Sequence, residues 1–135
     1  MRRIGGLALV LCLLMFTAGC SVQESNLEKL KDLDFTVVDE DNIPEEMAAE
    51  IEERKEKPFK TTYADKGALY ICEGYGAQGS SGYSIEVTDV YETQNAIYIH
   101  TNLLGPAGEE EVVDQITYPY VVIKIEYNEK NVVFD

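Results

Sequence analysis

Alternation along the chain is the sequence feature that most constrains this fold. Segments 83–88, 96–104 and 120–127 each place every second side chain on one face: Tyr83, Ile85 and Val87; Ile97, Ile99, Thr101 and Leu103; Val121, Ile123, Ile125 and Tyr127. A period of two is typical of strands that bury one face. Residues 69–73 form a continuous apolar run, as a buried strand does, and residues 35–38 and 132–134 indicate shorter strands. Residues 91–95 and 128–131 are expected to be turns.

Residues 39–57 differ from the rest, because they carry helix signals. Asn42 is expected to be the N-cap, with Glu45 at the third position of a capping box. The pairs Glu50/Arg54 and Glu53/Lys57 have i,i+4 spacing, and Pro58 is expected to end the helix. Its thin apolar stripe, which can cover a sheet but cannot build a core alone, is Ile43, Met47 and Ile51. We therefore predict a mainly β fold with a minor α component, namely a small antiparallel β-sandwich or open barrel with one N-terminal helix.

The first twenty residues have the layout of an export signal. Arg2 and Arg3 precede an apolar run over residues 4–16, and small residues 17–19 lead directly to Cys20. That run is too short to span a bilayer comfortably. The order resembles a bacterial lipobox, which implies cleavage before Cys20 and lipidation there, with a diacylglyceryl thioether and an acyl chain such as palmitate. We expect an extracytoplasmic protein that is held at the cell membrane surface by its lipid.

Composition sets the expected organisation of the chain. Residues 1–19 are expected to be the signal peptide, 20–32 a polar tether, 33–58 a short strand plus the helix, and 59–135 a β-domain. Leu27, Leu30 and Leu33 are expected to order part of the tether as a helical turn. The net charge of −14 becomes −16 once Arg2 and Arg3 are removed with the signal. A surface this acidic repels nucleic acid. We interpret its charge as keeping the domain soluble more than as forming a site for a specific cation.

No catalytic or metal-binding set can be named. Cys72 lies in an apolar run and His100 is the only histidine, so we interpret Cys72 as a core residue and expect His100 to point away from the buried face. Neither a nucleophile–base pair nor a zinc set is indicated, so we expect a protein that is not an enzyme and carries no cofactor or metal. The acidic clusters at 39–41, 45–46 and 109–114 are interpreted as solvated charge, with weak calcium binding as the alternative.

Two segments carry the strongest local signals. Residues 74–79 match GxGxxG after a strand, but a strand pattern follows where dinucleotide binding needs a helix, so that interpretation is rejected. We expect the glycines to form a turn that presents a partner-binding loop: Tyr75, Gly76, Gly79, Ser80, Ser81, Gly82 and Tyr83. The second segment contributes Tyr118, Pro119 and Tyr120. The alternative is that the tyrosines are core and cross-strand residues.

These segments carry a family resemblance. Residues 82–87, followed by 118–122, resemble the PrcB C-terminal family, whose members show a Thr-Gly-Gly-Tyr-Ser-type turn and a Tyr-Pro-Tyr-type strand start. The resemblance covers about residues 69–127. More distantly, the turn is similar to a loop of chagasin-type cysteine-protease inhibitors. The family takes its name from a lipoprotein subunit of a bacterial surface protease complex, so the resemblance implies an accessory or modulator that binds a surface or secreted protease.

A second hypothesis stays open beside the resemblance. The chain can instead be a lipoprotein that binds a cation or an envelope polymer and has no protease partner. We expect a domain of this size to have little room for a ligand pocket of about 300 Å³ or more.

Overall fold

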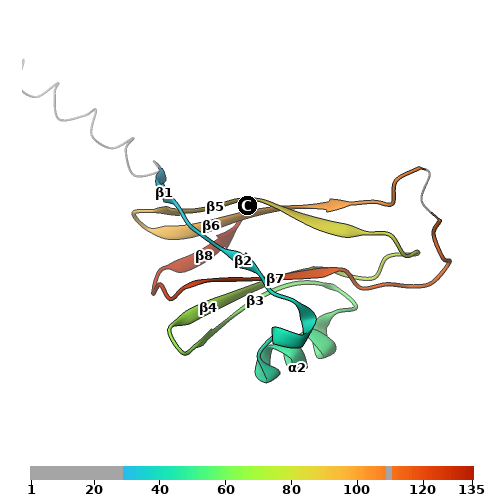
Figure 1. Cartoon of the computed structure of the whole chain (residues 1–135), viewed down its shortest axis with the longest axis horizontal. Coiled ribbons are helices and arrows are strands. Elements are labelled where there is room, and N and C mark those ends of the chain that lie inside the picture. The colour runs from blue at the N-terminus through green and yellow to red at the C-terminus, as the bar shows by residue number, and fades with distance from the viewer. Residues whose placement is uncertain (1–28, 109–110) are drawn as a thin grey trace, which may run out of the picture.

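Two four-stranded sheets face each other in the computed structural model, which describes residues 29–108 and 111–135 (Figure 1). The first sheet has the order β1 (Lys29–Asp32), β5 (Ser84–Thr93), β6 (Ala96–Leu104) and β8 (Asn131–Phe134). The second has the order β2 (Thr36–Val37), β7 (Tyr120–Glu126), β4 (Ala68–Tyr75) and β3 (Pro58–Asp65). One α-helix, α2 (Glu45–Arg54), lies on the outer face of the second sheet.

The predicted mainly β fold with one helix before its long strands is confirmed, and of the two architectures the structure is the sandwich. The two sheets are separate and do not close into a barrel. Every strand pair is antiparallel except β6 and β8, which run parallel from Ala96↔Asn131 to Ile99↔Phe134. The final edge strand expected at residues 132–134 is therefore present.

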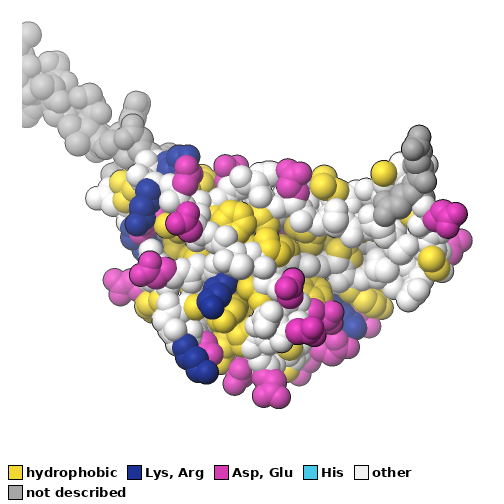
Figure 2. Space-filling model, viewed as in Figure 1, with side chains coloured by type: hydrophobic (Ala, Val, Ile, Leu, Met, Phe, Trp, Pro, Cys, Tyr) yellow, Lys and Arg dark blue, Asp and Glu magenta, His cyan; other side chains and the backbone are white. Residues whose placement is uncertain are grey.

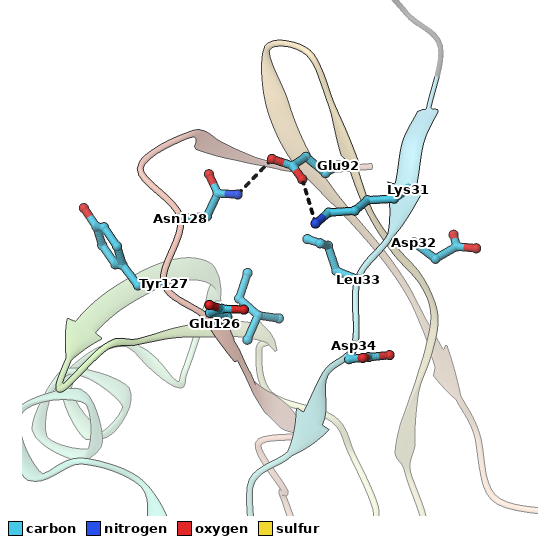
Figure 3. Close-up of a pocket in the computed structure, with 9 residues that line it drawn as sticks. Lys31, Asp32, Leu33, Asp34, Glu92, Glu126, Tyr127 and Asn128 are labelled. Atoms are coloured by element: carbon cyan, nitrogen blue, oxygen red, sulfur yellow. Dashed lines mark hydrogen bonds and ion pairs between the residues drawn. The ribbon is translucent and has the colours of Figure 1, made fainter.

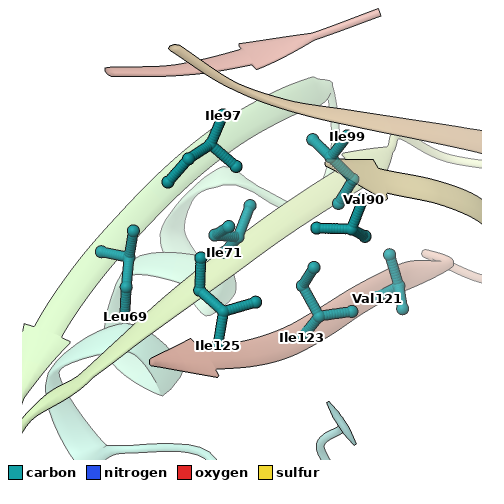
Figure 4. Packing of buried hydrophobic residues seen from close by; sticks show 8 residues of the cluster. All are labelled: Leu69, Ile71, Val90, Ile97, Ile99, Val121, Ile123 and Ile125. Carbon is teal, nitrogen blue, oxygen red and sulfur yellow. The ribbon is translucent and has the colours of Figure 1, made fainter. Parts of the chain in front are cut away.

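The main core lies between the two sheets and comes from the alternating segments (Figure 4). Ile71, Ile97 and Ile123 are fully buried there, each on a different strand. The remaining buried members of this cluster are Leu69, Val90, Ile99, Val121 and Ile125. Tyr127, which the alternating pattern placed on the buried face with Ile123 and Ile125, lies past the end of β7 and is 54% exposed.

A second, smaller core explains why the sequence of β4 is a continuous apolar run and does not alternate. Its outward-facing Cys72 and the neighbouring Val122 of β7 are covered by α2 through Met47 and Ile51, together with Phe59. Because the inner face packs on the other sheet and the outer face packs under the helix, β4 is buried on both sides. The thin apolar stripe of the helix thus covers one face of the sheet, as its pattern indicates.

The predicted helix start is wrong. Asn42 belongs to a 3-10 helix over Glu40–Asn42, and the α-helix begins after Pro44, whose carbonyl accepts the Ala48 N–H at 2.9 Å. A residue that precedes proline avoids the α region, and Ile43 accordingly has ψ 131°, so Asn42 cannot cap this helix. At the other end the helix stops at Arg54, short of Pro58.

Of the two predicted ion pairs on the helix, one is present. The Glu50–Arg54 pair forms at 2.9 Å. Lys57 lies beyond the helix end, so Glu53 and Lys57 do not share a helical face, and Lys55 instead pairs with Glu52 at 2.8 Å.

Two further local predictions are wrong. Residues 29–32, the end of the predicted tether, form β1 and not a helical turn, because their backbone pairs with Tyr91–Thr93 of β5. The turn predicted at 91–95 shrinks to Gln94 and Asn95, since the Thr93 hydroxyl accepts the N–H groups of Asn95 and Ala96 at 3.3 and 3.1 Å. The predicted signal peptide, the predicted lipidation site Cys20, and Leu27 lie outside the described residues.

The sandwich has two distinct ends. We call the end where β1 begins, beside the 94–95 turn, the tether end. We call the opposite end, where β4 leads into β5 and β6 leads into β7, the loop end (Figure 1, right). Within the described part of the chain, no helix is long and apolar enough to cross a bilayer.

Candidate functional site

Both motif segments lie at the loop end, where they are joined. The loop after β4 pairs with the segment before β7 through a bridge between Gln78 and Thr117. The Gln78 N–H donates to the Thr117 carbonyl at 2.8 Å, and the Thr117 N–H donates back at 3.0 Å. The Tyr75 N–H also donates to the Pro119 carbonyl at 3.0 Å. Two segments about forty residues apart in sequence thus form one surface.

Serines of the glycine-rich loop strengthen this junction. Ser81 donates its N–H to the Val113 carbonyl at 3.1 Å, and its Oγ accepts the Val113 N–H at 2.9 Å. The Thr117 hydroxyl donates to the Ser80 carbonyl at 2.7 Å. Ser80 and Ser81 therefore hold the segment before β7 against the loop, a contact that sequence spacing alone does not reveal.

The glycines of the loop have different roles. Gly76 and Gly82 have φ of 77° and 91°, and a Cβ on Gly82 would lie 2.8 Å from Cβ of Pro106. Both positions therefore favour glycine for its backbone conformation and for close packing. Gly79 is exposed, has no such φ, and would place a Cβ in open space. Gly79 is thus the position of this loop that tolerates a side chain.

Tyr75 faces the space between the sheets. Its hydroxyl is hydrogen-bonded to the Thr101 hydroxyl across the sandwich, and Thr101 donates to a Glu73 carboxylate oxygen at 2.7 Å. Because a threonine hydroxyl carries one hydrogen, Tyr75 is the donor to Thr101. This polar relay closes the loop end of the core, and a partner contact by Tyr75 stays a prediction.

The other motif aromatics do not gather around Tyr75. Tyr83 is half-buried with its ring close to Gly105. Tyr118 and Tyr120 line a cavity of about 260 Å³ beside α2, and Lys55 Nζ lies 4.9 Å from the Tyr118 ring centre. Burial raises the pKa of Tyr120, which packs on the smaller core. The aromatic residues thus support the loop end from several sides and do not form one cluster.

Three apolar side chains in segment 112–116 belong to this surface although the sequence pattern did not indicate them. Val112, Val113 and Ile116 are 44%, 59% and 60% exposed, although they sit on the segment that Ser81 and Gln78 hold in place. Figure 2 shows yellow side chains among magenta ones at this end, with no dark blue there in that view. The one sequence feature that could have indicated them is the apolar pair Val112-Val113, which lies outside the alternating strand segments.

The charged side chains of the two loop-end segments are all acidic, and the nearest cation that the structure places beside them is Lys55, over the Tyr118 ring. Residues 76–84 and 104–119 contain no Lys or Arg, while the second stretch contains Glu109, Glu110, Glu111 and Asp114. Glu111 and Asp114 are exposed, and the other two lie outside the described residues. An acidic, partly apolar surface follows from these positions.

A cleft of about 550 Å³ at the tether end contradicts the expected lack of room for a pocket (Figure 3). It lies between the crossover from β1 to β2 and the end of β7, and the core residue Ile125 forms part of its lining. On its wall Glu92 accepts from Lys130 Nζ at 2.7 Å and from Asn128 Nδ2 at 2.9 Å. These donors, Lys130 foremost, lower the pKa of Glu92.

The remaining candidate residues are placed away from the loop end. Cys72 is fully buried, as expected of a core residue, and burial raises its pKa to about 12. His100 is half-buried, with Nδ1 3.0 Å from the Asp135 carbonyl oxygen. Across residues 29–108 and 111–135, no three His, Cys, Asp or Glu side chains converge as a metal site.

One comparison with known proteins gives a match. Residues 69–126 match the family model described as PrcB C-terminal, which confirms the resemblance that the two motif segments indicate. The matched stretch runs from β4 through β7 and so includes the loop end. No curated protein and no solved structure matches the chain.

Proposed function

We propose that this chain is a lipid-anchored, extracytoplasmic protein-interaction domain that serves as an accessory or modulator of a surface or secreted protease. The observation that carries the proposal is the match of residues 69–126 to the PrcB C-terminal family, whose name refers to a protease-complex subunit. In this role the domain binds a protein and performs no catalysis itself.

The geometry of the loop end supports binding there. Four backbone hydrogen bonds connect the end of β4 and the loop after it with the segment before β7, at Gln78–Thr117, Ser81–Val113 and Tyr75–Pro119. Loops fixed on a rigid scaffold commonly carry recognition, because little conformational entropy is lost on binding. Exposed Gly79 and Ile116 then offer contact positions on a pre-ordered surface.

The position of β1 fits a tethered domain. The chain enters at the tether end through Lys29, which pairs with Thr93, and the ten-residue β5 extends from Thr93 there back to Ser84 at the loop end. A strand of that length spans about 33 Å. A lipid on Cys20 would therefore hold the tether end near the membrane and present the loop end to proteins beyond it.

The anchor is tested by metabolic labelling with a fatty-acid analogue. We expect label on the wild-type chain and none on Cys20→Ala, because two or more acyl chains on one residue make a stable anchor. Equal labelling of both would remove the anchor from the proposal.

The partner is tested by co-purification from detergent-solubilised membranes. Gly79→Trp adds bulk at the loop end without a clash inside the domain, and Leu30→Trp is the matched control at the tether end, where Leu30 is 61% exposed. We expect a protease to co-purify with wild type and with Leu30→Trp, and to be lost with Gly79→Trp. Recovery of no protease with any of the three would refute the proposed function.

One observation supports the alternative of a cation- or envelope-polymer-binding lipoprotein. The cleft of about 550 Å³ at the tether end has room for a small ligand and carries exposed Asp34 and Glu126 on its wall. Titration with calcium and with cell-wall fragments, followed by NMR shifts of Leu33 and Tyr127, tests it. Unchanged spectra would exclude this alternative.

A further inference from the structure

We infer that segment 112–116 docks a protein surface that is apolar at its centre and basic at its rim. The inference deepens the proposed function, on which it rests for the claim that the partner is a protein. It adds the chemistry of that partner and the side chains of this chain that meet it, namely Val112, Val113 and Ile116.

The apolar side chains of this segment are exposed on a backbone that hydrogen bonds hold in place. Both backbone polar groups of Val113 are bonded to Ser81, so this residue cannot easily turn its side chain inward, and that side chain is 59% exposed. Ile116 is 60% exposed and precedes Thr117, whose N–H and carbonyl are both bonded to Gln78. Apolar side chains held toward solvent in this way favour burial against another surface.

The charged residues next to these apolar side chains in the segment are acidic. Glu111 and Asp114 flank the apolar side chains and are exposed, and no Lys or Arg occurs in residues 76–84 or 104–119. A second copy of this acidic surface, or an anionic membrane, would be repelled. A partner with Lys or Arg around an apolar centre complements both the charge and the apolar area.

The tether end differs in this respect, although it also exposes apolar side chains. Leu30 is 61% exposed, but it lies between Lys29 and Lys31 on a strand. Its surroundings therefore contain positive charge, and Leu30 serves as the matched control for a change in exposed apolar area.

The test uses the full chain in phosphatidylcholine nanodiscs and a pair of short synthetic peptides. Each peptide has the same apolar centre with one tryptophan, flanked by lysines in one and by glutamates in the other. Because the chain contains no Trp, peptide fluorescence reports binding directly, and empty nanodiscs supply the blank. The proteins are wild type, Val113→Asp, Ile116→Asp and Leu30→Asp, with folding checked by circular dichroism.

We expect wild type to bind the lysine-flanked peptide at least about tenfold more tightly than the glutamate-flanked one. Val113→Asp and Ile116→Asp should each weaken that binding by about tenfold, while Leu30→Asp leaves it unchanged. Raising salt from about 50 to about 500 mM should weaken the binding as well.

Equal binding of the two peptides, no binding of either, or equal losses in Leu30→Asp and Val113→Asp would overturn the inference. These outcomes are separate from the co-purification of a protease. A protease that co-purifies while the lysine-flanked peptide fails would leave the proposed function standing and remove only the chemistry inferred here.

Discussion

Ser81 and Val113 are joined by two hydrogen bonds across thirty-two residues of sequence, one from each backbone N–H. Ser81 Oγ accepts the Val113 N–H at 2.9 Å, and the Val113 carbonyl accepts the Ser81 N–H at 3.1 Å. This relationship fixes an exposed apolar residue on the loop end and connects the two motif segments that the sequence singled out.

Ser81→Ala removes only one of these two bonds, because the backbone donor remains. We expect the free energy of unfolding to fall by about 0.5–1.5 kcal/mol and the Val113 amide to exchange faster with deuterium. Urea denaturation and NMR hydrogen exchange measure the two effects. Ser84→Ala, at an exposed position in β5, is the control, and unchanged exchange at Val113 in Ser81→Ala would contradict the account.

Gly82 and Gly79 should respond oppositely to alanine. At Gly82 the φ of 91° and the approach to Pro106 should make alanine cost about 1–3 kcal/mol of stability. At Gly79 alanine meets nothing and reduces the entropy of the unfolded chain, so stability should be unchanged or rise by up to about 1 kcal/mol. Urea midpoints of the two variants compare them directly, and similar losses at both positions would show that this loop geometry is wrong.

Tyr75→Phe tests the relay inside the sandwich. Loss of the hydroxyl removes a donor to Thr101 but leaves the Thr101–Glu73 bond, so we expect a loss of about 1 kcal/mol. Tyr127→Phe, at a residue 54% exposed, should change stability little and serves as the control. Denaturant melts are sufficient, and equal stability of Tyr75→Phe and wild type would argue against the relay.

Stability should depend on pH through Glu92. Lys130 and then Asn128 lower its pKa in the folded state below the ordinary 4.5. Its carboxylate therefore contributes stability above pH 4.5, and that contribution is lost as the pH falls through the folded-state pKa. We expect wild type to melt higher than Glu92→Gln at neutral pH and the two melting temperatures to converge in acid. A difference that stays constant down to strongly acidic pH would contradict this ion pair.

Sequence pattern predicted the parts of the fold that depend on local side-chain order. Alternation identified β5, β6 and β7 because each buries one face between the sheets. β1 could not be predicted this way, since all four of its residues are exposed and it is held by backbone pairing with β5. The helix start was missed because Pro44 restricts Ile43, a stronger effect than the capping preference of Asn42.

The candidate site was predicted only in part. The motif segments lie within the family match, but their pairing is a long-range contact between Gln78 and Thr117 that no local pattern encodes. Val113 and Ile116 were overlooked because an apolar residue outside an alternating pattern can be either buried or exposed. Only the hydrogen-bonded backbone of the folded protein shows that their side chains face solvent.

Site-specific photo-crosslinking in intact cells that carry the chain natively shows which end of the sandwich meets a protease. A benzophenone amino acid replaces Ile116 at the loop end in one strain and Leu30 at the tether end in another, both at similar exposure. We expect a crosslink to a protease from position 116 and none to that protease from position 30. A crosslink to the protease from position 30 alone, or no crosslinked protein at position 116, would contradict this expectation.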